Sequence, residues 1–162
     1  MYRRLRASLD AGIERPFFEH YFKACRARLG DRLPALVPQV YLHYDPKSVH
    51  ERVRLAAAAP RPAATDGDAL PLPRQRMDFL LLLPGQVRVV LELDGQQHYA
   101  VGADAGAAAS PAQYARMVSA DRDLRLDGYE VYRFGGYELQ AGRLDDVVGS
   151  FFARLFARHG VA

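Results

Sequence analysis

The residues whose types and spacing best suit chemistry are two carboxylates, Asp78 and Glu92, each set in a strongly apolar segment. Two such side chains can hold Mg²⁺ or Mn²⁺ and leave the ion partly hydrated. An ion held in this way activates a water molecule and neutralises the charge that develops when a phosphodiester is cut. Taken singly, Asp78 is explained as a surface acid on an edge strand and Glu92 as part of a solvated face.

The pattern around these two acids predicts a β-hairpin that brings them together. The apolar odd positions are Met77, Phe79, Leu81, Leu83, Val87, Val89, Leu91 and Leu93. A period of two on either side of Pro84-Gly85 is typical of paired strands with one buried face. If a three-residue loop pairs Leu83 with Val87, the odd positions of both strands lie on this buried face. Asp78 then lies opposite Glu92, with Cβ atoms roughly 4.5–5.5 Å apart, and a cation between them removes their repulsion.

The sequence before the hairpin predicts a helix and a first strand. Residues 13 to 29 indicate an amphipathic helix that begins near Glu14, carries Pro16 in its first turn and ends at Gly30. Its apolar residues recur every four positions, at Ile13, Phe17, Tyr21, Cys25 and Leu29. Residues 36 to 44 alternate as a strand that stops at the turn signal Asp45-Pro46.

The sequence after the hairpin predicts two further helices and one strand. The first helix is expected from its N-cap Ser110 to Asp127. Its apolar stripe comprises Tyr114, Met117, Val118 and Leu124. Asp121 falls on the same stripe. Residues 129 to 134 indicate a strand, and residues 144 to 159 a helix whose continuous apolar stripe packs a core.

These elements predict a single α/β (α+β) domain over residues 1–162, a mixed sheet flanked by helices. The order is a helix, a three-stranded meander, a helix, a strand and a C-terminal helix. The N-terminal helical segment covers residues 1–30, the core 36–139 and the C-terminal helix 143–160. The stretch 56–72, rich in Pro and Ala, is expected to be a mobile loop within the core.

The bulk composition limits the functional classes. Apolar residues make up 49% of the chain and charged residues 25%, as in soluble globular proteins. A single cysteine, Cys25, excludes an internal disulfide framework and fits a reducing cytoplasm, where we expect the protein to be. No apolar stretch is long enough for a secretory signal or a membrane span. The net charge of +3 comes from scattered arginines and is explained by a solvated surface.

Three motifs together resemble a known superfamily. They are Arg-Met-Asp-Phe (76–79), Leu-Glu-Leu-Asp-Gly-Gln-Gln-His (91–98) and Asp-Arg-Asp-Leu-Arg-Leu-Asp-Gly-Tyr-Glu-Val-Tyr-Arg-Phe (121–134). Their order and spacing resemble the PD-(D/E)xK restriction-endonuclease-like superfamily, in particular the branch related to very-short-patch-repair endonucleases, with its E-x-D-G-x-x-H motif. The resemblance covers roughly residues 74 to 139. It implies a restriction-endonuclease-like core and phosphodiesterase activity dependent on Mg²⁺ or Mn²⁺.

The resemblance also implies roles for individual residues. Asp78 takes the place of the PD aspartate and Glu92 that of the D/E residue. The two carboxylates and the main-chain carbonyl of Leu93 would be the protein ligands of the metal. Asp94 stands where the superfamily has its lysine, and Lys23 and Lys47, the lysines of this chain, lie far from the motif.

Because the lysine is missing, another group must orient water or stabilise charge. Gln96, His98 and Arg122 are the candidates, and a histidine that is neutral at pH 7 is suited to relaying a proton or binding phosphate. Asp121 is expected to pair with Arg133 or Arg122 in support of the site. Glu14 resembles the helical glutamate of the fold, and Arg74, Arg76 and Arg88 are candidates for phosphate contacts.

Three functions remain open from the sequence. The leading one is a metal-dependent endonuclease that hydrolyses DNA, with nucleic acid as its partner, no membrane association and a homodimer left open. The second is a nucleic-acid-binding module of the same fold that has lost its chemistry, which the missing lysine supports. The third is a protein-interaction domain, which the modest charge supports.

Overall fold

The computed structural model describes residues 2–9, 12–42, 45, 76–95, 100–101, 108–140 and 142–161. The expected mobile loop at 56–72 lies outside the described residues, as do Gln96 and His98. The described helices are α1 (Tyr2–Ala7), α2 (Glu14–Leu29), α4 (Pro111–Leu126) and α5 (Leu144–Arg158), with 3₁₀ turns η1 (Gly30–Arg32) and η3 (Pro84–Gln86). None of the described helices is long and apolar enough to cross a membrane.

The sheet has four strands, β1 (Ala35–Tyr41), β2 (Arg76–Leu82), β3 (Arg88–Asp94) and β6 (Glu130–Gly135), in the spatial order β1-β2-β3-β6. The first three are antiparallel neighbours, and β6 pairs with β3 in parallel. The expected mixed sheet flanked by helices is therefore confirmed. The helix α1 lies within the expected N-terminal helical segment (1–30), where it was not predicted as a separate helix. The short pair β4 (Ala100–Val101) and β5 (Ala108–Ala109) was not predicted.

The hairpin has the predicted register. Phe79 pairs with Leu91 and Leu82 with Arg88, and the N–H of Leu83 donates to the carbonyl of Val87 at 3.0 Å. The pairing set by the three-residue loop thus runs along both strands. Its last pair, Phe79–Leu91, is next to Asp78 on β2 and to Glu92 on β3.

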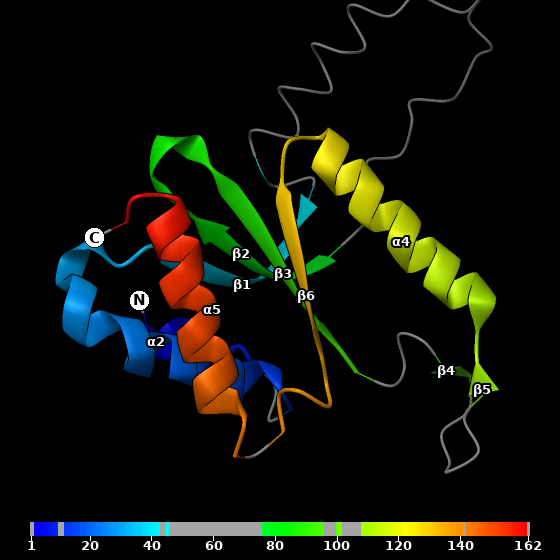
Figure 1. Ribbon diagram of the computed structural model, residues 1–162, viewed down its shortest axis with the longest axis horizontal. Helices are drawn as coiled ribbons and strands as arrows, with labels where there is room; N and C mark the ends of the chain where they lie inside the picture. Colours follow the sequence, from blue (N-terminus) through cyan, green and yellow to red (C-terminus); the bar gives the residue numbers. More distant parts are fainter. Residues whose placement is uncertain are drawn as a thin grey trace, which may run out of the picture.

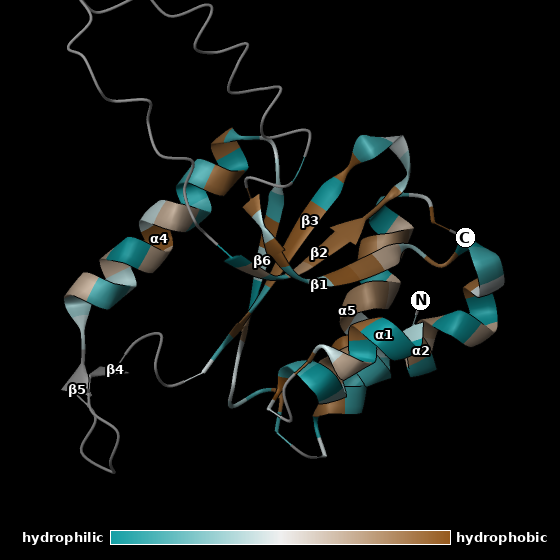
Figure 2. Ribbon diagram, turned by 180° about the vertical axis from the view of Figure 1, so that it is seen from behind, coloured by the Kyte–Doolittle hydropathy of each residue, from teal (hydrophilic) through white to brown (hydrophobic). Residues whose placement is uncertain are grey.

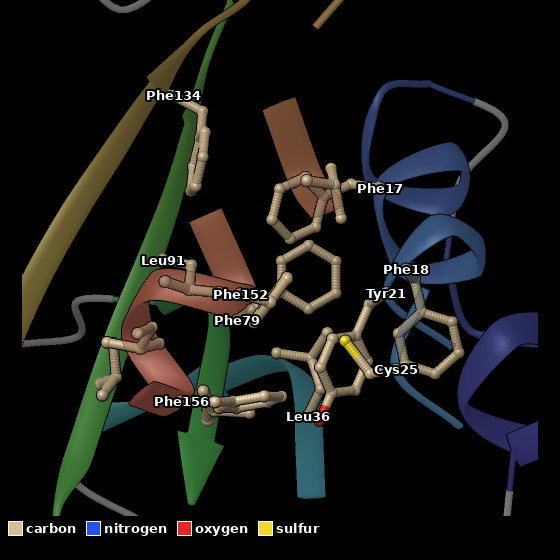
Figure 3. Packing of buried hydrophobic residues seen from close by; sticks show 14 of the residues in the cluster. Phe17, Phe18, Tyr21, Cys25, Leu36, Phe79, Leu91, Phe134, Phe152 and Phe156 are labelled. Atoms are coloured by element: carbon tan, nitrogen blue, oxygen red, sulfur yellow. The ribbon is translucent and has the colours of Figure 1, made fainter. Parts of the chain in front are cut away.

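Helices cover the two faces of the sheet (Figure 1), with α2 and α5 together on one face and α4 on the other. The reverse view in Figure 2 shows the same division, with apolar positions concentrated in the strands and on the helix sides toward them. The larger core lies under α2 and α5. In it, the ring of Phe17 is 5.5 Å from Phe79, 5.1 Å from Phe134 and 6.0 Å from Phe152 (Figure 3). Phe17 therefore joins both helices to the sheet.

A second core cluster lies on the other face of the sheet, so the prediction of one buried face was wrong. It consists of Leu42, Met77, Leu80, Val90, Leu124, Tyr129 and Val131. Leu124 is the one α4 residue that is fully buried. Tyr114, which we placed on the apolar stripe of this helix, is 59% exposed, so that prediction was also wrong. The N-terminal half of α4 extends past the sheet (Figure 1), which explains the exposure.

The face of Met77 was predicted wrongly as well, because the strand alternation reverses next to it. Phe79 belongs to the cluster under α2 and α5, whereas Met77, two residues earlier, belongs to the other cluster. The reversal occurs at Asp78 and, on the neighbouring strand, at Gln39, which has a φ of 52°. This left-handed conformation is uncommon for a residue other than glycine. Both strands therefore depart from regular geometry beside the predicted site.

We expect Phe17→Ala to lower the free energy of unfolding by about 3–5 kcal/mol, because it leaves a cavity where α2, α5 and the sheet meet. Tyr114→Ala, the control, removes an exposed aromatic ring and should change the same quantity by about 0.5 kcal/mol or less. Urea unfolding followed by circular dichroism measures both. Similar losses for the two variants would contradict this description of core and surface.

Candidate active site

Asp78 and Glu92 lie beside each other, as the hairpin register predicts. They occupy the positions next to the Phe79–Leu91 pair. The Asp78 carboxylate accepts a hydrogen bond from the Leu93 N–H at 2.8 Å, so the side chain of Asp78 reaches the main chain of β3. Asp78 does not lie on an edge strand, because β2 is an inner strand of the sheet. Glu92 is not part of a solvated face, because it is only 6% exposed.

Burial gives Glu92 unusual properties for a carboxylic acid. Loss of solvation, followed by the nearby charge of Asp78, raises the pKa of Glu92 to about 8, and Arg133 opposes this shift. The Oε1 atom of Glu92 is buried and has no hydrogen-bond partner among the described residues. An unpaired buried polar atom costs on the order of 1–3 kcal/mol. A bound cation would satisfy this oxygen and favour the charged carboxylate.

The main-chain carbonyl of Leu93, expected as a third ligand, belongs to the same end of β3. In a strand, the N–H and C=O of one residue point to the same side and those of the next residue to the opposite side. The Leu93 N–H is directed at Asp78, and the Asp94 carbonyl accepts from Gly136 beyond β6 at 2.8 Å. The Leu93 carbonyl is therefore directed toward Asp78, as a shared metal site requires.

Asp94, Asp121 and Arg133 form a continuous ionic cluster beside Glu92. Arg133 pairs with Glu92 in the parallel register of β3 and β6. Its Nη1 donates to Asp94 at 2.6 Å, its Nη2 to Asp121 at 2.8 Å, and its Nε to Asp121 at 2.9 and 3.0 Å. The predicted pairing of Asp121 with Arg133 is confirmed. Asp94 uses its carboxylate to hold an arginine, a role that the sequence did not predict.

Glu14 lies at the start of α2, where it was predicted, and is linked toward the site by Gln39. The side-chain amide of Gln39 donates to the Glu14 carboxylate at 3.1 Å. Gln39 lies between the pairs Pro38–Phe79 and Val40–Met77, which places it across from Asp78 on β1. No pattern in the sequence predicts this contact, because it depends on the left-handed backbone at Gln39.

Two other candidates lie elsewhere. Arg122 is exposed on α4, and its neighbour Asp121 pairs with Arg133 and not with it. Arg88 lies at the opposite end of β3 from Glu92 and donates to the buried Asp45 at 2.8 Å. The prediction that Arg88 lies near the site for phosphate contacts was therefore wrong.

Of the remaining candidates Arg74, Arg76 and His98, the structure describes Arg76. Arg76 is exposed at the start of β2. Arg74 and His98 lie outside the described residues, so their proposed roles stay predictions.

The ligand set fits a small, hydrated divalent cation. Across the described ranges, no three His, Cys, Asp or Glu side chains converge as a ready-made metal site. Asp78, Glu92 and the Leu93 carbonyl make a sparse set, which suits Mg²⁺ because that ion keeps several of its waters. Asp94 and Asp121 add negative charge, since both also raise the pKa of Glu92. Arg133 balances only part of this charge.

Comparison with known proteins finds no matching family model, no similar curated protein and no similar solved structure. The resemblance to the PD-(D/E)xK superfamily therefore rests on the motifs alone and stays a prediction.

The raised pKa of Glu92 predicts a pH-dependent stability in the absence of divalent metal. Below pH 4.5, the usual pKa, the carboxyl is neutral in the folded and unfolded states. Between pH 4.5 and about 8 the unfolded chain releases this proton while the folded protein retains it, so stability falls as pH rises. The free energy of unfolding of the wild type should fall by roughly a few kcal/mol across this window, and Glu92→Gln should abolish this decline.

The measurement is urea unfolding in EDTA at a series of pH values from 4.5 to 9. Glu19→Gln, which neutralises a surface glutamate paired with Arg6, is the matched control and should keep the wild-type pH dependence. A Glu92→Gln protein with that same pH dependence would contradict the description of Glu92 as a buried, destabilised acid.

Proposed function

We propose that this protein is a Mg²⁺- or Mn²⁺-dependent endonuclease that hydrolyses phosphodiester bonds in DNA. The observation that carries the proposal is the buried Glu92 carboxylate, which lies beside Asp78 and has one oxygen without a partner in the described part of the chain. Two repelling acids in an inner part of the sheet are costly to folding unless a cation compensates them. The motif resemblance independently points to the same pair.

The residues of the chain have distinct roles in this proposal. Asp78, Glu92 and the Leu93 carbonyl hold the ion, and the hydrogen bond from the Leu93 N–H fixes the Asp78 carboxylate. A divalent ion at such a site supplies Lewis acidity and an activated water. Asp94 and Asp121 orient Arg133, so neither needs to bind the metal. Glu14, held by Gln39, contributes further negative charge near the sheet.

The proposed setting is a reducing cytoplasm, with DNA as the partner. The proposal of a cytoplasmic setting rests on the single cysteine of the chain, Cys25, which is buried. DNA is preferred to RNA because the motifs resemble those of repair and restriction endonucleases. A homodimer remains compatible with this proposal.

One observation favours a second candidate, a nucleic-acid-binding module without catalysis. Asp94 occupies the place of the motif lysine, and Arg133, the arginine beside Glu92, is already bound by two carboxylates. If no other group activates water, the same surface would bind nucleic acid without cutting it. Cleavage assays with and without chelator separate the two functions.

We expect the purified protein to nick or linearise plasmid DNA in Mg²⁺ or Mn²⁺ and to stop when EDTA is added. Asp78→Asn and Glu92→Gln should each reduce the cleavage rate by about 100-fold or more, because each removes a charged metal ligand. Binding to DNA without metal should persist or increase, since either substitution removes negative charge near the phosphates. Gel electrophoresis measures cleavage and a salt-controlled gel shift measures binding.

Asp31→Asn is the matched control, because Asp31 is an exposed aspartate in the turn η1. It should cut DNA at the wild-type rate. Wild-type protein that binds DNA but never cuts it, over a range of DNA and RNA substrates, would overturn the nuclease proposal and support the binding module.

A further inference from the structure

Arg133 is held in a defined orientation beside Glu92. Three of its nitrogens donate to Asp94 and Asp121, at distances of 2.6 to 3.0 Å. Asp94 comes from the end of β3 and Asp121 from the middle of α4, so the guanidinium is clamped between a strand and a helix. A guanidinium bound on two sides loses little further freedom when it binds a ligand.

The guanidinium keeps donors for a ligand. Arginine has five N–H groups. The contacts to Asp94 and Asp121 occupy the Nε–H and one N–H on each of Nη1 and Nη2, which leaves one N–H on each η nitrogen without an acceptor among the described residues. The side chain of Arg133 is 19% exposed, so part of it meets solvent. Each of these N–H groups can donate to an anionic phosphate oxygen, which is a charge-assisted hydrogen bond.

The electrostatics of the site explain why a cation is needed there. Glu92 lies beside Asp78 and pairs with Arg133 across β3 and β6, and Asp94 and Asp121 both contact the Arg133 guanidinium. A phosphodiester anion that approaches this cluster is repelled by every carboxylate and attracted by Arg133 and by any bound metal. Arg133 is therefore placed to receive a phosphate oxygen beside the metal ligands.

We propose that Arg133 is a phosphate-binding residue, whose free η N–H groups donate to a non-bridging oxygen of the substrate phosphodiester, and that Asp94 and Asp121 are the positioning residues that aim it. This inference rests on the proposed nuclease function and names the residue that takes over the charge of the missing lysine. It also explains why Asp94 occupies the position of the lysine, since Asp94 orients Arg133.

The test uses dimethyl phosphate, the simplest phosphodiester anion, and follows the arginine N–H signals of the full-length protein by NMR in Mg²⁺. The Arg133 Nε–H signal should shift with saturation in dimethyl phosphate and should not shift in neutral trimethyl phosphate. Arg133→Lys should weaken dimethyl phosphate binding several-fold. Arg133→Gln combined with Asp121→Asn should weaken it by at least about tenfold.

The double variant removes the cation together with one of its two acids, so that folding is not penalised by an unpaired Asp121. Arg26→Gln, which changes an exposed arginine of α2, is the matched control and should bind dimethyl phosphate as the wild type does. Mn²⁺ affinity, measured by electron paramagnetic resonance, should stay within about threefold of wild type in every Arg133 variant, because Arg133 is no metal ligand.

The outcomes separate this inference from the proposed function. Equal dimethyl phosphate binding by the wild type and both Arg133 variants would overturn the role of Arg133, even if the protein cuts DNA. Failure of the wild type to bind Mn²⁺ would overturn the metal-dependent nuclease. In that case the role of Arg133 is still decided by the dimethyl phosphate titration without metal.

Discussion

The arrangement of this protein depends on a carboxylate, Glu92, placed in the central strand of a sheet that is covered on both faces. Its neighbours along β3 are large apolar residues of the two cores, so Glu92 has little access to water. A charged group in such a place needs a compensating charge or must keep its proton. The structure places Asp78 beside it, and this second acid makes the ionisation of Glu92 still less favourable. A divalent cation would compensate both acids at once, and this is the basis of the nuclease proposal.

One of the carboxylates around Glu92 also attaches α4 to the sheet. This helix buries Leu124 and leaves most of its other residues partly or fully exposed, so apolar packing alone holds it weakly. The ion pair between Asp121 and Arg133 is a second link between α4 and β6. Because Arg133 also binds Asp94, the position of α4 and the charge at the site are coupled through one side chain. A partly buried bidentate pair of this kind is worth more than an exposed surface pair.

Sequence reasoning reached α2, α4, α5, the four strands of the sheet, the hairpin register and the proximity of Asp78 to Glu92, because these follow from periodicity and loop length. It failed where the backbone departs from regular alternation. The positive φ of Gln39 and the reversal at Asp78 move Met77 to the other face, and no local signal marks them. The contact of Asp94 with Arg133 was also missed, because it depends on how β3 and β6 align after a long crossover. Knowledge of that parallel register would have revealed it.

The central claim is that Asp78 and Glu92 together form a divalent metal site. Mn²⁺ titration of the wild type, Asp78→Asn and Glu92→Gln proteins, followed by electron paramagnetic resonance at neutral pH and low salt, tests this directly. The account predicts saturable Mn²⁺ binding by the wild type, with competition by Mg²⁺, and a loss of at least about tenfold in affinity for either variant. No saturable binding by the wild type, or binding that both substitutions leave unchanged, would contradict it.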